Sequence, residues 1–376
     1  MKPRIRRELP PEVADLIDVL GAGPATASAV SMEHAAAAAA MVATAMSAPL
    51  LLVLPTSAQA ERVGTLVRWL LANGPVPYGF LRWPRGAESP YEEVVESPFV
   101  ASARAGTLGT FALSDAPFAL VLDAPSLARR TLPFDAFMEG VQLLEVGREV
   151  DRDALVGLLA AAGYRRTTTV AEVGEFAVRG GVVDLFSPID DDPVRIDLDG
   201  DTIAALKYFD AATQRTQRTT RATWVVPAWE VPADPDRLRD ARIRMAEAAA
   251  ELRVPSREVA AVEAQIDAGR MPPAFGAMLP LLHGDLDLPT AYLAEDALVV
   301  VVDPAGCAAS ASAALDALRE DHRARLARPG LVAFPEALAV DGEGLLAALG
   351  SRPRMLRIDL GNPGLLGPTA EIGRAH

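Results

Sequence analysis

The sequence predicts an α/β protein into which a small α+β domain with a mostly antiparallel sheet is inserted. Two continuous apolar runs of strand length, 50–54 and 297–302, are each followed by a helical pattern, which is typical of buried parallel strands. Between them, residues 194–198 alternate apolar and polar side chains and precede Asp199-Gly200, a strong two-residue hairpin signal. We therefore predict three domains, at residues 1–146, 147–218 and 219–376.

The elements of the first region follow from apolar spacing. Residues 10–20 predict an amphipathic helix, and a helix through the alanine tract leads to the first apolar run. The uncharged stretch 35–55 is long enough to span a bilayer. Because alanine is only weakly hydrophobic and Pro49 divides the stretch, we expect instead a helix and a strand of a cytoplasmic protein. Ser57 is the expected N-cap of the next helix, and 119–122 is a further buried strand.

The middle and third regions are predicted in the same way. A helix at 151–162 is followed by strands within 170–186, and 203–209 returns from the hairpin. These elements form a small half-exposed sheet with one helix. Helical patterns at 237–252 and 310–326 indicate that α/β character returns in the third region.

Composition bounds the function. Hydrophobic residues make up 50% and charged residues 23% of the 376 positions, a globular balance that excludes a largely disordered chain. The single cysteine, Cys307, excludes a disulfide framework and multi-cysteine metal sites. The formal net charge of −14 opposes the phosphate neutralisation that drives DNA binding, so we expect no general nucleic-acid binding by this chain.

Nucleotide hydrolysis has no support in the sequence. A P-loop needs G-x-x-x-x-G-K-[ST], and the only lysines, Lys2 and Lys207, lack both the preceding glycine and the following Ser or Thr. Residues 21–28, with Gly21 and Gly23, stand ahead of a helix. They are either a helix-connecting turn or the remnant of a dead nucleotide site.

Other chemistry-bearing residues favour structural roles. Cys307 has no histidine near it in the sequence, and we expect a structural thiol. The run 190–192 of three aspartates predicts either a cation site or a solvated turn, and the turn is favoured because calcium loops place their ligands at alternate positions. We predict no catalytic, cofactor-binding or metal-binding residue.

One block of motifs carries a family resemblance. Residues 172–218 contain E-V-G-E-F-A-V-R-G-G-V-V-D-L-F-S-P, then P-V-R-I-D-L-D-G-D-T-I, then K-Y-F-D-A-A-T-Q-R-T. In the order of its parts, the block resembles the second domain of the bacterial transcription-repair coupling factors, the Mfd family, and more distantly that of UvrB. UvrB keeps an intact P-loop and an aromatic DNA-clamping hairpin, and neither is visible in this sequence, so the Mfd family is favoured.

The resemblance implies an N-terminal UvrB-like module of domains 1A, 2 and 1B with degenerate P-loop-NTPase-like α/β layers. ATP and Mg would then belong to motor domains beyond this chain, and RNA polymerase and DNA would be contacted only by those other regions. The end of the sequence, 371–376, is interpreted as a truncation. The resemblance also implies that a C-terminal autoinhibitory domain of the full-length protein masks the docking surface.

In this family, domain 2 recruits UvrA through two arginines and an aromatic residue. By motif position these fall on Arg179, Arg195 and Asp199, so the aromatic is replaced here by an acid. Strand alternation independently places Arg195 opposite the apolar face. Two alternatives remain: Arg195 pairs with Asp197 or another neighbouring acid, and Arg179 bonds loop carbonyls as a structural residue. Alanine at either arginine is expected to weaken UvrA binding with little loss of thermal stability.

The sequence therefore predicts a non-catalytic adaptor that recruits UvrA to stalled transcription for nucleotide excision repair. Two alternatives are an ATP-dependent DNA translocase or helicase, an activity that would belong to the full-length protein, and a divergent UvrB-like damage-binding protein. The second alternative requires DNA affinity, which the acidic balance opposes.

Overall fold

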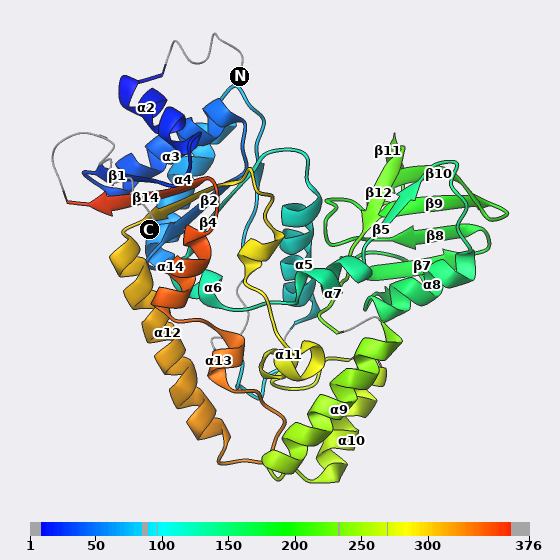
Figure 1. The fold of residues 1–376 in the computed structure, drawn as a ribbon. Coiled ribbons are helices and arrows are strands. Elements are labelled where there is room, and N and C mark those ends of the chain that lie inside the picture. Colours follow the sequence, from blue (N-terminus) through cyan, green and yellow to red (C-terminus); the bar gives the residue numbers. More distant parts are fainter. Residues whose placement is uncertain (1–8, 85–88, 96, 232–233, 269, 362–376) are drawn as a thin grey trace.

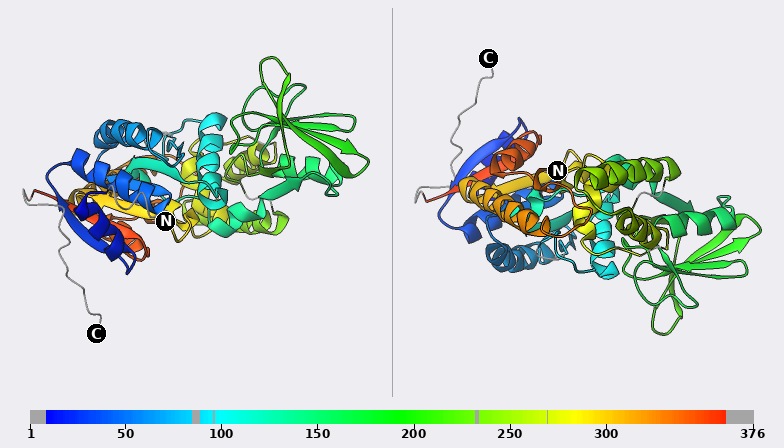
Figure 2. Two further views of the ribbon diagram at one scale, coloured as in Figure 1. Left: turned by 90° about the horizontal axis from the view of Figure 1, so that it is seen from above. Right: turned by 90° about the horizontal axis from the view of Figure 1, so that it is seen from below.

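Two sheets organise the molecule. The computed structural model describes residues 9–84, 89–95, 97–231, 234–268 and 270–361 (Figure 1). One six-stranded sheet is parallel, with the order β1-β14-β13-β2-β4-β3, and a second has the order β11-β10-β9-β8-β7-β6 and is mostly antiparallel. The second sheet lies at one end of an elongated molecule, away from the parallel sheet (Figure 2). The predicted α/β class with a separate antiparallel domain is confirmed. The expected truncation at 371–376 lies outside the described residues.

Strands from both ends of the chain build the parallel sheet. Its members are β1 (Ala25–Ala29), β2 (Leu50–Leu54), β3 (Gly79–Phe80), β4 (Phe118–Asp123), β13 (Leu298–Val302) and β14 (Met355–Leu360). We expected residues 219–376 to form an α/β region of their own, and this is corrected. β13 pairs directly with β2, with Leu298 opposite Leu50. Both strands are buried along their whole length, and such strands are most stable at the centre of one shared sheet.

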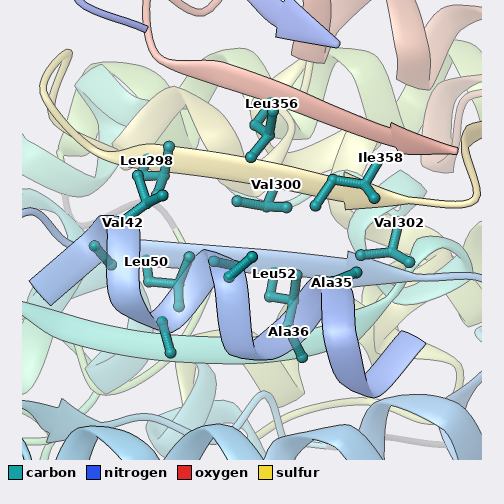
Figure 3. Close-up of a cluster of buried hydrophobic side chains, with 14 of the residues drawn as sticks. Ala35, Ala36, Val42, Leu50, Leu52, Leu298, Val300, Val302, Leu356 and Ile358 are labelled. Carbon is teal, nitrogen blue, oxygen red and sulfur yellow. The ribbon is translucent and has the colours of Figure 1, made fainter. Parts of the chain in front are cut away.

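Helices cover both faces of this sheet. One face is covered by α2 (Pro11–Leu20), α3 (Met32–Met46) and α4 (Ser57–Ala72). The other is covered by α5 (Pro98–Leu113), α6 (Ala124–Ala128), α12 (Pro304–Arg325) and α14 (Gly342–Gly350). The small side chains Ala35 and Ala36 of α3 let the helix lie close to Leu50 and Leu52 of β2 (Figure 3). The alanine tract is thus a helix followed by a strand, as predicted. None of the helices described here is long and apolar enough to cross a membrane.

The glycine-containing segment 21–28 does not occupy the position of a phosphate loop. Gly21 ends α2, and residues 25–29 form β1. The connection from β1 to α3 is only Val30-Ser31, where the Ser31 hydroxyl accepts a hydrogen bond from the His34 amide. A phosphate loop follows a strand and opens a helix, whereas this turn precedes a strand. It therefore joins a helix to a strand, which corrects both interpretations made from the sequence.

Two predicted helix starts shift. The N-cap of α4 is Thr56 rather than Ser57, because Thr56 and Gln59 form a reciprocal capping box. α12 begins at Pro304, six residues before the predicted start at 310, since Asp303 caps it through the Gly306 amide and proline suits the first helical position.

A group of helices and short elements fills the space below the two sheets (Figure 1). It comprises α9 (Pro235–Glu251), α10 (Ser256–Asp267), α11 (Phe275–His283) and α13 (Pro335–Leu338). Two other short elements, α7 (Phe134–Glu139) and the 3-10 turn η1 (Pro289–Tyr292), belong instead to the cluster of α5 and the parallel sheet, through Phe137 and Tyr292. Met245 of α9, Met278 of α11 and Leu318 of α12 belong to one buried cluster. This cluster joins α9 and α11 to α12, which packs on the parallel sheet.

The antiparallel sheet and one helix form the middle of the chain. The elements are α8 (Arg152–Ala161), β6 (Arg165–Arg166), β7 (Glu175–Arg179), β8 (Val182–Leu185), β9 (Val194–Asp199), β10 (Thr202–Phe209) and β11 (Thr216–Thr220). Leu155 and Leu159 of α8 are buried with Val183, Val194 and Ile196 on the inner face of the sheet. A short pair, β5 (Gln142–Glu145) with β12 (Ala222–Val225), closes the base. The predicted hairpin at Asp199-Gly200 is present, and a second hairpin joins β7 to β8; each turn has a glycine at positive φ (+61° at Gly200, +60° at Gly180).

The segment 226–231 fastens this sheet domain to the scaffold. The Ala228 amide donates to the Ala162 carbonyl, and the Ala228 carbonyl accepts from the Ser102 hydroxyl of α5. Glu230, which is 1% exposed, accepts both Nε and Nη2 of Arg104 at 2.7 and 2.5 Å. The orientation of the antiparallel sheet is therefore set by polar contacts to α5.

Candidate docking face

The outer face of the antiparallel sheet carries alternating charges. We define the outer face by Arg179, Asp184, Arg195, Asp197 and Lys207. These side chains point away from α8 because successive strand residues face opposite sides, and their neighbours Val183, Val194, Ile196 and Leu206 are buried on the inner face. The predicted orientation of Arg195, opposite the apolar face, is thus confirmed.

Asp184 lies at the centre of this face. It is directly opposite Arg195 in the β8–β9 register and is 1% exposed. Its Oδ1 accepts from Arg195 Nε at 2.7 Å, and its Oδ2 accepts from Arg195 Nη2 at 2.9 Å and from Arg179 Nη2 at 2.7 Å. One buried carboxylate therefore joins the two arginines that the motif comparison singled out.

Arg195 is held by hydrogen bonds to Asp184 and by the ring of Phe209. Its guanidinium carbon lies 4.7 Å from the centre of the Phe209 ring, and its side chain is 23% exposed. The hydrogen bonds to Asp184 are the main cause that raises the pKa of Arg195. The alternative in which Arg195 pairs with a neighbouring acid is therefore the one observed, with Asp184 as the acid. Asp197 pairs instead with Lys207, at 2.5 Å.

Arg179 and Asp199 occupy more open positions. The Arg179 side chain is 53% exposed at the end of β7, and it pairs with Asp184 rather than with a loop carbonyl. The guanidinium that reaches the Gly180 carbonyl is that of Arg152. Asp199 is exposed at the tip of the β9–β10 hairpin, opposite Thr202. The structure thus brings Arg179 and Arg195 together through Asp184 and leaves Asp199 apart.

Sequence reasoning missed Asp184 and Lys207. The alternation that placed Arg195 also predicts the orientation of Asp184: in V-V-D-L, Val183 faces inward, so Asp184 must face outward. The missing information was the register, because only the pairing of β8 with β9 sets Asp184 opposite Arg195.

The aspartate run 190–192 is not simply a solvated turn. Asp190 accepts the Tyr208 hydroxyl at 2.8 Å and the Thr223 hydroxyl at 3.0 Å. Burial raises its pKa to about 6, against the lowering effect of those hydrogen bonds. Asp190 therefore anchors the sheet domain at its base, and the expectation of full solvation is wrong for this residue. Across the described residues, no group of three potential metal ligands comes together.

We expect Asp190 to make stability depend on pH between about 4 and 6. Its folded pKa of about 6 lies above the ordinary 3.8, so the folded state binds more protons in this window and stability falls as the pH rises. Asp190→Asn keeps the shape of the side chain but does not titrate. The melting temperature of the variant minus that of the wild-type protein should therefore rise between pH 4 and pH 7. A difference that stays constant over this range would contradict the prediction.

Two other titratable groups are buried in the scaffold. Burial raises the pKa of the Cys307 thiol to about 12, and its Sγ donates to the Val302 carbonyl at 3.3 Å. Burial lowers the pKa of His283 to about 4, while its Nε2 contacts the Glu230 carbonyl at 2.8 Å. A protonated thiol held within the helix–sheet contact fits the expected structural role of Cys307.

Comparison with known families places the outer face in a recognised class of module. Residues 143–230 match the UvrB interaction domain family. The matched range includes every residue of the outer face, together with β5 from Leu143 onward, β12 and the fastening segment as far as Glu230. The part of the chain that carries the Arg179–Asp184–Arg195 group is therefore similar to the UvrB interaction domain.

The wider chain is similar to transcription-repair-coupling factors. It is 31% identical to the one from Myxococcus xanthus over 68% of this chain and 22% of the relative. Identity to the Bacillus subtilis factor is 27% over 50% of this chain and 16% of the relative, and to the Escherichia coli factor it is 38% over 31% and 10%. The predicted resemblance to this family is confirmed. The matched regions span between 10% and 22% of the length of these relatives.

Proposed function

We propose that this chain is a non-catalytic docking module that recruits UvrA during transcription-coupled nucleotide excision repair. The observation that carries the proposal is the outer face itself: two arginines joined by a buried aspartate, within the residues that match the UvrB interaction domain. A guanidinium fork recognises carboxylates in a fixed geometry, so this face suits an acidic surface on a protein partner.

The remaining partners and cofactors belong to the same proposal. We propose that this chain binds no nucleotide and that ATP-dependent DNA translocation is a property of the full-length protein, which also contacts RNA polymerase and DNA through other regions. The absence of a P-loop lysine from the sequence supports this division. A C-terminal domain of the full-length protein that covers the outer face would make recruitment of UvrA conditional.

A titration of the purified chain with UvrA from the same source tests the proposal. We expect saturable binding by calorimetry, together with no ATP turnover and no saturable ATP binding by the chain alone. Binding should weaken as salt rises, because partly exposed charges at the contact are screened. Absence of binding to UvrA at micromolar concentrations would refute the docking function, and ATP turnover would refute the non-catalytic one.

A DNA-binding measurement distinguishes the docking module from the alternative of a divergent UvrB-like damage-binding protein. With a net charge of −14, the chain is expected to show no binding to damaged or undamaged duplex at physiological salt. A preference for damaged duplex would favour that alternative.

A further inference from the structure

Asp184 is an unusual residue for an outer sheet face. It is 1% exposed, although it faces the solvent side of the sheet, and the guanidinium groups of Arg179 and Arg195 are bonded to it there. A buried carboxylate is tolerated only when it is paired and hydrogen-bonded. Arg195 alone meets this need, since it bonds both carboxylate oxygens. The contact from Arg179 is therefore additional to what burial of Asp184 requires.

The two arginines differ in how many of their N–H donors remain free for a partner. Arg195 uses Nε and Nη2 on Asp184 and is 23% exposed. Arg179 uses only Nη2, is 53% exposed, and its Nε and Nη1 have no hydrogen-bond partner among the described residues. A guanidinium has five N–H donors, so Arg179 can donate hydrogen bonds to a second carboxylate while it stays bonded to Asp184.

We propose that Asp184 is a positioning residue for docking: it holds one edge of the Arg179 guanidinium so that the remaining donors address a carboxylate of the partner. This inference rests on the docking function proposed above. Arg195 anchors Asp184, Asp184 orients Arg179, and Arg179 makes the contact. An arginine that is ordered before binding loses less conformational freedom on binding, which strengthens the complex.

Asp184→Asn tests the inference because the two physical explanations predict opposite signs. The substitution removes a negative charge beside two arginines and keeps the side-chain shape. If long-range charge governed docking, an acidic partner would bind the variant more tightly. We expect instead that UvrA binds roughly three- to tenfold more weakly, because Arg179 loses its orientation. Unchanged or tighter binding would overturn the positioning role.

A double-mutant cycle separates positioning from a general structural effect. In the Arg179→Ala background, Asp184→Asn should cause no further loss of UvrA affinity, because the residue that Asp184 orients is gone. Losses that simply add would show that Asp184 acts through the fold rather than through Arg179, and would overturn the inference. Circular dichroism and thermal melting of each variant show whether the sheet is retained.

Arg179→Lys provides a test that leaves Asp184 and Arg195 intact. Lysine keeps the charge and can pair with Asp184, but it lacks the planar fork. We expect it to lose most of the affinity that Arg179→Ala loses, and full retention would overturn the inference. Arg242→Ala is the matched control: Arg242 of α9 also bonds one carboxylate, that of Asp267, is 45% exposed, and lies outside the sheet domain. If Arg179→Ala itself has no effect while UvrA still binds, the assigned face fails and the docking function stands.

Discussion

Replacing Arg179 with alanine is expected to weaken UvrA binding by about tenfold or more, which is the usual effect of removing a hydrogen bond to a charged group at an interface. The melting temperature should change by no more than about two degrees, because the side chain is half exposed and its ion pair contributes little to folding. Isothermal titration with UvrA and thermal melting of the same samples measure both quantities. Wild-type affinity in this variant would contradict the assignment of Arg179 to the contact.

Arg195→Ala is expected to behave differently, and this changes the expectation drawn from the sequence. It removes two of the three hydrogen bonds to the buried Asp184 and uncovers the Phe209 ring. We expect a loss of stability on the order of 1–3 kcal/mol in addition to weaker docking. Equal melting temperatures for the two arginine variants would show that Asp184 is not held by Arg195.

Glu230→Ala is expected to have the largest effect on stability. Removing Glu230 takes two charge-assisted hydrogen bonds away from Arg104, whose side chain is 15% exposed, and hydrogen bonds to charged groups contribute about 1.5–3 kcal/mol each. Since Glu230 lies in the segment that fastens the sheet domain to α5, the loss should appear as a lower melting temperature. UvrA affinity measured below that temperature should be retained, because the outer face is untouched.

Glu139→Ala is the matched control for this prediction. Glu139 also bonds both Nε and Nη2 of an arginine, Arg237, at 2.6 and 2.7 Å, but the two side chains are 44% and 35% exposed. Solvent screens such a pair, so its loss should cost less than about 1 kcal/mol. If both variants melt at the same temperature, burial of the Arg104–Glu230 pair does not matter to stability.

Periodicity and turn chemistry predicted the elements that bury continuous apolar runs or alternate cleanly. The strand at 50–54, the hairpin at Asp199-Gly200 and the helix through the alanine tract are all present. Three strands of the parallel sheet, β1, β3 and β14, escaped prediction. β1 reads A-T-A-S-A, whose small residues carry little strand preference, and its strand form depends on its pairing with β14.

Long-range pairing was the part that local patterns could not supply. The apolar pattern of residues 298–302 does not predict that this strand pairs with residues 50–54, because any fully buried strand has the same pattern. The same limit applied to the docking face. The motif comparison identified Arg179 and Arg195 one by one, whereas the carboxylate that joins them depends on strand register.

The chain enters and leaves the sheet domain through two neighbouring strands. β5 leads in and β12 leads out, and Gln142 lies opposite Val225 in their antiparallel pair. The intervening residues therefore form a cassette whose two ends meet at one place. We expect that a short loop can replace this unit without moving the strands of the parallel sheet, because β5 and β12 pair with each other and not with that sheet.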